Sequence, residues 1–195
     1  MDTVVVVILI VIVAVIVAAA AVLVYRRRQS DRLKERFGPE YARAVEDSGD
    51  RRSAERELAQ REKRRESFET RPLSSEIAQR YRDEWDALQQ RFVDDPSGSV
   101  TEADRFVVRV MRERGYPVDE FDRRAGDISV DHPEVATYYR QAHDVAVAQT
   151  RGETDTEQLR RAVTAYRRLV DVLLEDHADA GNHHPTGPAE AKEQP

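Results

Sequence analysis

The stretch VVVVILIVIVAVIVAAAAVLVYRRR, residues 4–28, decides the architecture, because no other part of the chain has such a composition. Its first 21 positions, Val4 to Val24, carry no polar or charged side chain. A helix of this length extends about 31 Å, which matches the hydrocarbon thickness of a bilayer. Backbone N–H and C=O groups find no water in hydrocarbon, so a single segment has only the helix available there. The stretch therefore predicts a transmembrane helix with a short N-terminus, residues 1–25.

Two other interpretations of this stretch are a buried core helix and a cleavable signal peptide. A core helix rarely runs this long without a polar residue. A signal peptide has basic residues, then a shorter apolar run, then small residues at the cleavage point. Here the three residues before Val4 include no Lys or Arg, and Val22 to Val24 extend the run past the alanines of 18–21. These features favour a membrane anchor, and the signal peptide stays open as an alternative.

The charges that flank the apolar stretch predict its orientation. Asp2 lies on one side. Six basic residues lie on the other: Arg26, Arg27, Arg28, Arg32, Lys34 and Arg36. Because basic flanks stay in the cytoplasm, we expect a single-pass protein of the cell membrane with its N-terminus outside and its C-terminal domain cytoplasmic. The same side chains attract anionic lipid headgroups, although their role in orientation is enough to explain them.

Charge divides the rest of the chain in two. Residues 26–72 hold 15 basic and 11 acidic residues, a net charge of +4. Residues 73–195 hold 16 basic and 25 acidic residues, a net charge of −9. An anionic bilayer would attract the basic segment that follows the membrane helix and repel the acidic segment beyond it. Nucleic-acid binding leaves a basic face on a protein, so we expect the lipid bilayer as a partner and no nucleic acid.

Residues 26–72 predict a charged juxtamembrane spacer made of helices. Gly38-Pro39 ends the helix that continues from the membrane segment, and Ser48-Gly49-Asp50 marks a turn. Residues 50–69 contain too few apolar positions for a helix that faces a core. Those positions are Ala54, Leu58, Ala59 and Phe68. Ion pairs at i,i+4 spacing would support a solvated helix, and no heptad repeat sustains a coiled coil.

Residues 73–177 predict a small, mostly antiparallel helical bundle, which makes the fold class all-α. Apolar side chains recur every three or four positions over residues 77–92, 100–111, 135–148 and 159–174. Such stripes are typical of helices that share a core, and short connections favour antiparallel neighbours. Residues 178–195 show no periodicity and predict a disordered tail.

Turn and cap signals separate the helices of this bundle. Asp95 is expected to cap a helix, as are Ser99 with Glu102 and Thr154 with Glu157. A shorter helical segment is expected around residues 119–125, ended by Gly126.

The sequence contains no recognised catalytic motif. Cysteine is absent, which excludes disulfides, thiolate ligands and a cysteine nucleophile. The serines lie outside known nucleophile motifs, and no glycine-rich phosphate loop occurs. His132 and His143 are too far apart on a helix to share a metal ion, and His183-His184 is a weak exposed pair. We therefore expect no enzyme, no cofactor and no metal site.

The aromatic side chains on the apolar stripes suit core packing better than a cofactor site. Candidates to line a groove for a partner helix are Tyr81, Trp85, Tyr138 and Tyr139. The favoured function is a membrane-anchored interaction or scaffold domain that binds a protein partner or a second copy of itself. The alternative is an exported helical protein of the cell envelope, whose N-terminal segment is a signal or a reversed anchor.

Several short segments of the sequence also resemble those of a known family. They are RLKERFGPEY (32–41), RPLS (71–74), RFVDDP (91–96), VMRERGYPVDEF (110–121) and SVDHPEV (129–135). As a group they look like a widespread family of short bacterial proteins with one N-terminal transmembrane segment and a helical C-terminal domain. The resemblance covers about residues 31–175. It implies the same domain outline, and it implies no activity, cofactor or catalytic residue.

Overall fold

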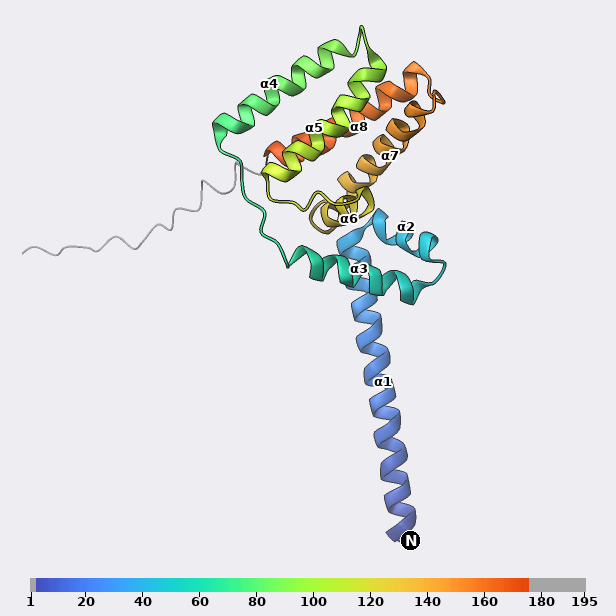
Figure 1. Ribbon diagram of the computed structural model, residues 1–195. Coiled ribbons are helices and arrows are strands. Elements are labelled where there is room, and N and C mark those ends of the chain that lie inside the picture. The colour runs from blue at the N-terminus through green and yellow to red at the C-terminus, as the bar shows by residue number, and fades with distance from the viewer. Residues whose placement is uncertain (1–2, 176–195) are drawn as a thin grey trace, which may run out of the picture. The chain divides into compact units, whose positions relative to one another are not determined.

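The computed structural model describes residues 3–175, and these residues form eight α-helices and no β-strand (Figure 1). The all-α prediction is confirmed. The helices are α1 (Thr3–Phe37), α2 (Pro39–Ser48), α3 (Arg51–Arg65), α4 (Ser75–Arg91), α5 (Pro96–Glu113), α6 (Phe121–Asp131), α7 (Pro133–Thr150) and α8 (Thr156–Glu175). The predicted disordered tail, residues 178–195, lies outside the described residues.

The described chain divides into two compact units. Unit 1 contains residues up to Glu66 together with Gly126–Glu134, and unit 2 contains Ser67–Ala125 together with the residues from Val135 on. The boundary between the units therefore falls inside α6. We describe each unit by itself.

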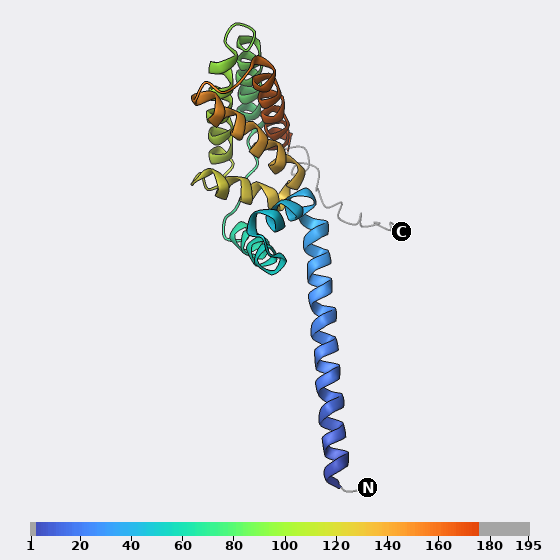
Figure 2. The ribbon, with the colours of Figure 1, turned by 90° about the vertical axis from the view of Figure 1, so that its right-hand side faces the viewer.

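Helix α1 continues without a break from the apolar stretch into the basic segment (Figure 2). Gly38, with a φ of 46°, ends the helix, because this left-handed region of backbone conformation favours glycine. The large apolar side chains from Ile10 to Val24 are 50 to 63% exposed. Within the described residues, α1 is the one helix long and apolar enough to cross a membrane.

Unit 1 has its own apolar core, which differs from the solvated spacer expected for residues 26–72. The core cluster consists of Leu33, Phe37, Tyr41, Ala44, Ala54, Leu58 and Val130. Each helix contributes only one or two of these side chains, so no single stretch shows an amphipathic stripe in the sequence. Ala54 and Leu58 of α3 nevertheless become buried, because α1, α2 and the end of α6 supply the other side chains of the core.

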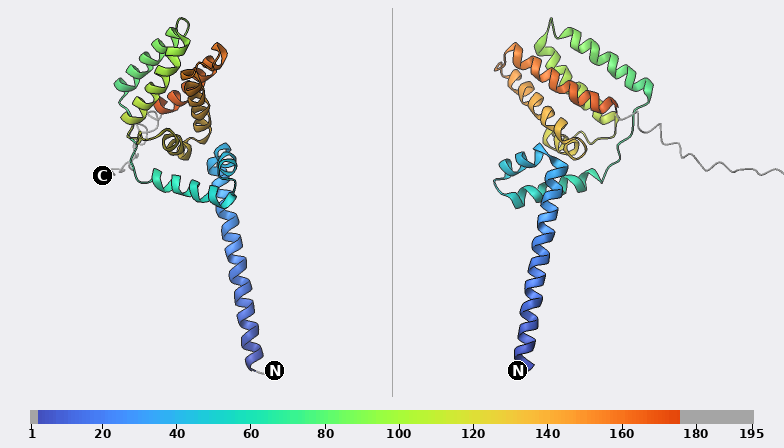
Figure 3. Two further views of the ribbon diagram at one scale, coloured as in Figure 1. Left: turned by 45° about the vertical axis from the view of Figure 1, so that its right-hand side comes forward. Right: turned by 180° about the vertical axis from the view of Figure 1, so that it is seen from behind.

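Unit 2 is built around α5 and α8, and α4 packs against both of them (Figure 3). The stripes predicted from the sequence form its core. The ring of Phe106 is fully buried and lies 5.6 Å from the ring of Tyr81 and 5.4 Å from that of Trp85, measured between centroids. Tyr139 connects α7 to this core through an edge contact with Tyr166 at 6.3 Å.

Of the three predicted caps, the one at Asp95 is found, and the pairs Ser99–Glu102 and Thr154–Glu157 are not the caps that the structure uses. The expected cap at Asp95 is confirmed, since its carboxylate accepts the Gly98 N–H at 2.9 Å and begins α5. Ser99 is therefore not a cap but a buried residue inside that helix. At α8, Asp155 exchanges hydrogen bonds with Gln158 at 2.8 and 2.9 Å, one residue beyond the predicted Thr154 pair. The cap of α5 thus lies four residues before the predicted Ser99 pair, and the capping box of α8 lies one residue after the predicted Thr154 pair.

The prediction that Gly126 ends a helix is wrong, because α6 continues to Asp131. The turn after Gly126 is anchored within unit 1 by tertiary contacts. Val130 joins the apolar core, and Asp127 and Asp131 pair with arginines of α3. These contacts outweigh the cost of one helical glycine, which is about 1 kcal/mol.

Candidate functional site

A basic groove lies in unit 1 between the end of the apolar stretch in α1 and the first half of α3. Its volume is about 530 Å³. Five arginines line it: Arg26, Arg27, Arg51, Arg52 and Arg56. Glu55 is the one acidic residue among its lining residues, which gives the lining a formal charge of +4. We call this feature the arginine groove.

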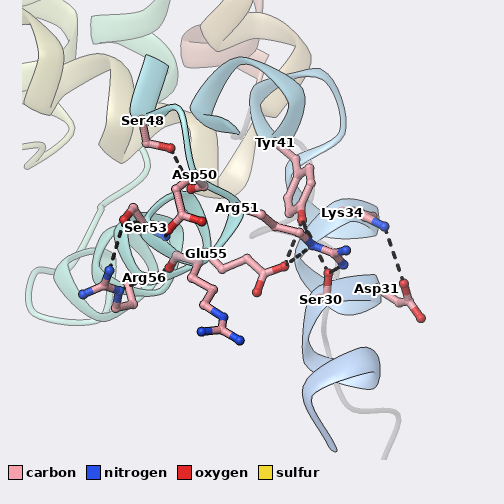
Figure 4. A network of polar contacts seen from close by, with 11 residues as sticks. Ser30, Asp31, Lys34, Tyr41, Ser48, Asp50, Arg51, Ser53, Glu55 and Arg56 are labelled. Atoms are coloured by element: carbon pink, nitrogen blue, oxygen red, sulfur yellow. Dashed lines mark hydrogen bonds and ion pairs between the residues drawn. The ribbon is translucent and has the colours of Figure 1, made fainter. Parts of the chain in front are cut away.

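A hydrogen-bonded network beside the groove joins α1, α2 and α3 (Figure 4). The Tyr41 hydroxyl donates to Glu55 Oε1 at 2.9 Å, and Arg51 Nε donates to the same oxygen at 3.0 Å. The guanidinium of Arg51 also donates to Ser30 Oγ. Burial raises the pKa of Glu55, but hydrogen bonds from Ser30, Arg51 and Tyr41 outweigh it and hold the pKa below its usual value. Glu55 is therefore ionised at neutral pH and fixes Arg51 in place.

The remaining arginines of unit 1 are mostly neutralised by carboxylates. These pairs are Arg32 and Arg36 with Glu62, Arg61 with Glu40 and Glu57, Arg64 with Asp127, and Arg65 with Asp131. The side chains of Glu40 and Asp127 are each 1% exposed. A buried carboxylate needs such a partner, so these pairs belong to the fold.

The groove differs, because four of its five arginines have no carboxylate partner in the part of the chain that the structure describes. Arg26, Arg27 and Arg52 form no ion pair there, and Arg56 donates to the Arg52 carbonyl oxygen and to Ser53 Oγ. Four arginines without an ion-pair partner among the described residues therefore line one groove, with the Asp50 carboxylate close enough to interact with Arg52. Charge concentrated in this way is typical of an anion-binding surface.

The six basic residues predicted to set the orientation fall into different environments. Arg26 and Arg27 line the groove, whereas Arg32 and Arg36 approach Glu62 at 2.7 and 3.2 Å. Lys34 lies 3.8 Å from Asp31, and Arg28 follows the groove arginines along α1. The sequence did not indicate Arg51, Arg52 and Arg56, because nothing in their spacing shows that α3 folds back against α1.

The four predicted groove aromatics are mostly buried. Tyr81, Trp85 and Tyr139 belong to the core of unit 2, and Tyr138 is half-buried under the Arg168 guanidinium, 4.5 Å from the ring centroid. Trp85 also lines a pocket of about 210 Å³ between α4 and α8. A partner groove stays a prediction, and Trp85 is placed at this pocket.

A polar cluster that the sequence analysis missed joins α5, α7 and α8. The carboxylate of Asp104 accepts the Tyr166 hydroxyl at 2.8 Å and lies 3.1 Å from His143 Nδ1. The ring of Phe121 stacks on that of His143, with centroids 3.6 Å apart. The sequence feature that could have indicated this cluster is Asp104, a carboxylate within the apolar pattern of residues 100–111. Tyr166 lies in the apolar pattern of residues 159–174 and could supply its donor.

The pKa values of this cluster favour hydrogen bonding between helices over acid–base chemistry. Burial raises the pKa of Asp104, but hydrogen bonds from His143 and Tyr166 outweigh it and the pKa lies below its usual value. Burial and the Asp104 carboxylate raise the pKa of Tyr166, and burial raises that of Tyr139 to about 12. Both tyrosines therefore keep their protons. The Tyr166 hydroxyl donates to Asp104, and the Tyr139 hydroxyl accepts the Arg124 Nε–H at 3.2 Å.

Among the described residues, no group of three or more His, Asp and Glu side chains is placed to hold a metal ion. His132 belongs to unit 1 and His143 to unit 2. The other three histidines, including the pair His183-His184, lie outside the described residues.

Comparison of the chain with protein-family models, with curated proteins and with solved structures finds no match. The resemblance noted for residues 31–175 therefore stays a prediction, and the function is argued from the chain's own residues.

Proposed function

We propose that the chain is a single-span membrane protein whose helix α1 anchors a helical interaction or scaffold domain at the cytosolic face of a membrane. The observation that carries this proposal is the exposure of α1. The large apolar side chains described from Ile10 to Val24 are 50 to 63% exposed, and the 18-residue apolar window of the helix is 0% buried. Exposed apolar area is unfavourable in water by about 25 cal/mol per Å², and a hydrocarbon environment removes that penalty.

The distribution of basic residues supports the cytosolic orientation. The N-terminal side of the apolar stretch holds Asp2, and the arginine groove adds three arginines of α3 to those that directly follow Tyr25. Positive charge at one end of a span favours retention of that end in the cytoplasm. The alternative, an exported envelope protein, would place the same arginines on the outer side.

The interaction role rests on unit 2. It is a folded helical surface with a pocket between α4 and α8 that places Trp85 beside Val170 and Leu174. Charged side chains, among them Arg82 and Asp171, line the rest of this pocket. Trp85, Val170 and Leu174 are each at most 4% exposed, so the charged side chains provide most of the surface that a partner would contact. We propose no catalysis, because the Asp104 cluster is explained by contacts between helices.

Insertion is tested by expressing the full chain in a bacterial host and washing the membranes with alkaline carbonate. We expect the protein to stay in the membrane and to float with lipid. The double variant Val15→Arg/Ile16→Arg disfavours insertion by about 6 kcal/mol and should be released. Its control, Val15→Leu/Ile16→Leu, should behave as the wild type. Release of the unaltered protein, or a shortened chain in the medium, would contradict the anchor.

Orientation is tested by protease treatment of intact spheroplasts that carry a C-terminal epitope on the chain. The epitope should survive until the cells are lysed. Digestion without lysis would support the envelope alternative.

The interaction role is tested by photo-crosslinking in the native membrane. A crosslinking amino acid is placed at Gln89, which lines the α4–α8 pocket, and as a control at Arg123, which is exposed elsewhere in unit 2. A discrete product at position 89 alone would support a partner or a second copy at this pocket. Equal or absent products at both positions would count against it.

A further inference from the structure

We propose that the arginine groove binds the phosphate group of an anionic phospholipid, taken from the leaflet at the C-terminal end of α1. This inference rests on the proposed membrane insertion and adds a ligand to it. The argument uses the position of the groove, its uncompensated charge and the location of α3.

The position of the groove matches the level of lipid headgroups. Leu23, which is 60% exposed, lines the groove and belongs to the last turn of the apolar stretch. Arg26 and Arg27 follow one turn later. In an inserted α1 the groove therefore begins where the hydrocarbon ends, which is where phospholipid phosphates lie. Leu23 and Ala59 would face the upper part of the lipid's chains, while the arginines face its headgroup.

The charge of the groove suits a phosphate. Guanidinium groups bind phosphate oxygens through paired N–H donors, and this geometry is one reason why arginine is common at phosphate sites. The guanidinium groups of Arg26, Arg27 and Arg52 form no ion pair with a carboxylate among the described residues. Arg56 also meets no such carboxylate, although its Nε and Nη2 donate to Arg52 O and Ser53 Oγ. The carboxylate of Glu55 is occupied by Tyr41 and Arg51, so it does not neutralise the other four arginines.

The start of α3 adds a second, independent argument. Arg51 and Arg52 occupy the first turn of α3, and no acidic residue lies in that turn. The N-terminus of a helix carries a partial positive charge, so a cation there is unfavourable unless an anion lies close by. Glu55 pairs with Arg51, so Arg52 is the cation that remains. Asp50 caps the helix by accepting the Ser53 N–H at 3.0 Å and supplies part of the compensation for Arg52. A bound phosphate would supply the rest.

A lipid explains the whole lining better than a soluble anion does. A free phosphate would contact the guanidiniums and leave Leu23 unused. A lipid headgroup is also held at the groove by its own chains, which raises its local concentration. Basic residues near a membrane surface each contribute about 1 kcal/mol of attraction to anionic lipid.

The test compares the full-length chain in nanodiscs of phosphatidylcholine with the chain in nanodiscs that also contain phosphatidylglycerol. The variant is Arg52→Gln/Arg56→Gln, which leaves the Arg51–Glu55–Tyr41 network intact. The matched control is Arg160→Gln/Arg167→Gln, which removes the same charge from exposed positions of α8. Hydrogen exchange of the α3 amides and native mass spectrometry of retained lipid are the two readouts.

We expect phosphatidylglycerol to slow exchange across α3 and to co-purify with the wild type and with the control. The groove variant should retain it about 30-fold less, which corresponds to two arginines at about 1 kcal/mol each. Equal retention by the variant and the control would overturn the inference. The same protection from inorganic phosphate in phosphatidylcholine nanodiscs would also overturn it, because the site would then take a soluble anion.

This design separates failure of the groove from failure of the anchor. If the wild type enters both kinds of nanodisc but shows no difference between them, the lipid site is wrong and the anchor stands. If it enters neither, the proposed anchor fails first, and the lipid site fails with it.

Discussion

The two units of this chain hold their helices together by different chemistry. Unit 2 relies on apolar stripes, with Phe106 packed between Tyr81 and Trp85 and with α8 buried along one face. Unit 1 has a cluster of seven core residues and surrounds it with arginine–carboxylate pairs, of which Glu40 and Asp127 are buried acidic partners. The comparison indicates that a short, highly charged segment can fold when each buried carboxylate meets a guanidinium.

The difference also predicts where each unit is vulnerable. An apolar core loses stability when a side chain is truncated and a cavity remains. A buried ion pair loses stability when one partner is removed and the other charge is left without compensation. Unit 2 should therefore be most sensitive to loss of volume, and unit 1 to loss of a single charge.

The largest effect is expected for Phe106→Ala in unit 2. The side chain is fully buried against two rings, and its removal should lower the free energy of unfolding by about 4 kcal/mol. Trp85 is the one tryptophan in the chain, so its fluorescence reports this unit directly during denaturation in detergent micelles. The control is Val93→Ala at a position 83% exposed, which should leave the midpoint unchanged. A shift as small as that of the control would mean that the ring cluster does not stabilise the bundle.

The next effect is expected for Arg64→Met in unit 1, because it removes the guanidinium that donates to the buried carboxylate of Asp127. The two groups are 2.9 Å apart, and Asp127 is 1% exposed. We expect a loss of about 3 kcal/mol, measured as faster hydrogen exchange of the α3 amides. The double variant Arg64→Met/Asp127→Leu should recover much of that loss, since it removes both charges together. If Arg64→Met left the hydrogen exchange of α3 unchanged, the proposed difference between the two units would be wrong.

These two regions also show what could be predicted from the sequence. The stripes of α4, α5, α7 and α8 and the apolar part of α1 were predicted, because each places its periodic apolar residues within one continuous segment. Local pattern and tertiary burial agree in those helices. The residue types that cap the helices were predicted correctly, but the predicted pairs at the starts of α5 and α8 lie a few residues from the caps observed. Several Ser, Thr and Asp side chains near each helix start can act as caps, so the sequence does not single out one position.

The core of unit 1 and the arginine groove could not be predicted in the same way. Val130 lies 72 positions after Leu58 in the sequence, yet both belong to one cluster. Ala54 and Leu58 alone gave no reason to expect burial of α3. The groove likewise needs Arg26 and Arg52 to meet across two helices, and a periodicity within one helix carries no information on that meeting. Gly126 was misread for the same reason, because the contacts that continue α6 come from α3.

A smaller effect is expected for Asp104→Asn in unit 2, and it should depend on pH. The pKa of Asp104 is lower in the folded chain than the ordinary value of 3.8, so its carboxylate stabilises the fold at any pH well above that value. The contribution is lost as pH falls through the folded pKa. At neutral pH we expect the free energy of unfolding of the variant to be about 1 kcal/mol below that of the wild type. Below pH 3.8 this difference should shrink, because the wild type loses the contribution of the carboxylate. Stability curves from pH 2 to 7 would reveal a constant difference if the carboxylate had no such role.

The smallest effect is expected for Glu157→Gln on the surface of unit 2. Hydrogen bonds from Arg160 and Arg161, at 2.8 and 3.1 Å, lower the pKa of Glu157 to about 2. Its stabilising contribution is present above the ordinary pKa of 4.5 and is lost as pH falls toward 2. Water and salt screen this exposed group, so we expect the unfolding midpoint of the variant to fall by less than that of Asp104→Asn and to approach the wild-type value at high salt. An NMR titration should find the low pKa at low salt and a rise toward the usual value at high salt. The same kind of short contact thus stabilises the fold strongly in unit 1, where the carboxylate is buried, and only weakly here. A midpoint shift as large as that of Arg64→Met would show that burial is not what separates the two kinds of pair.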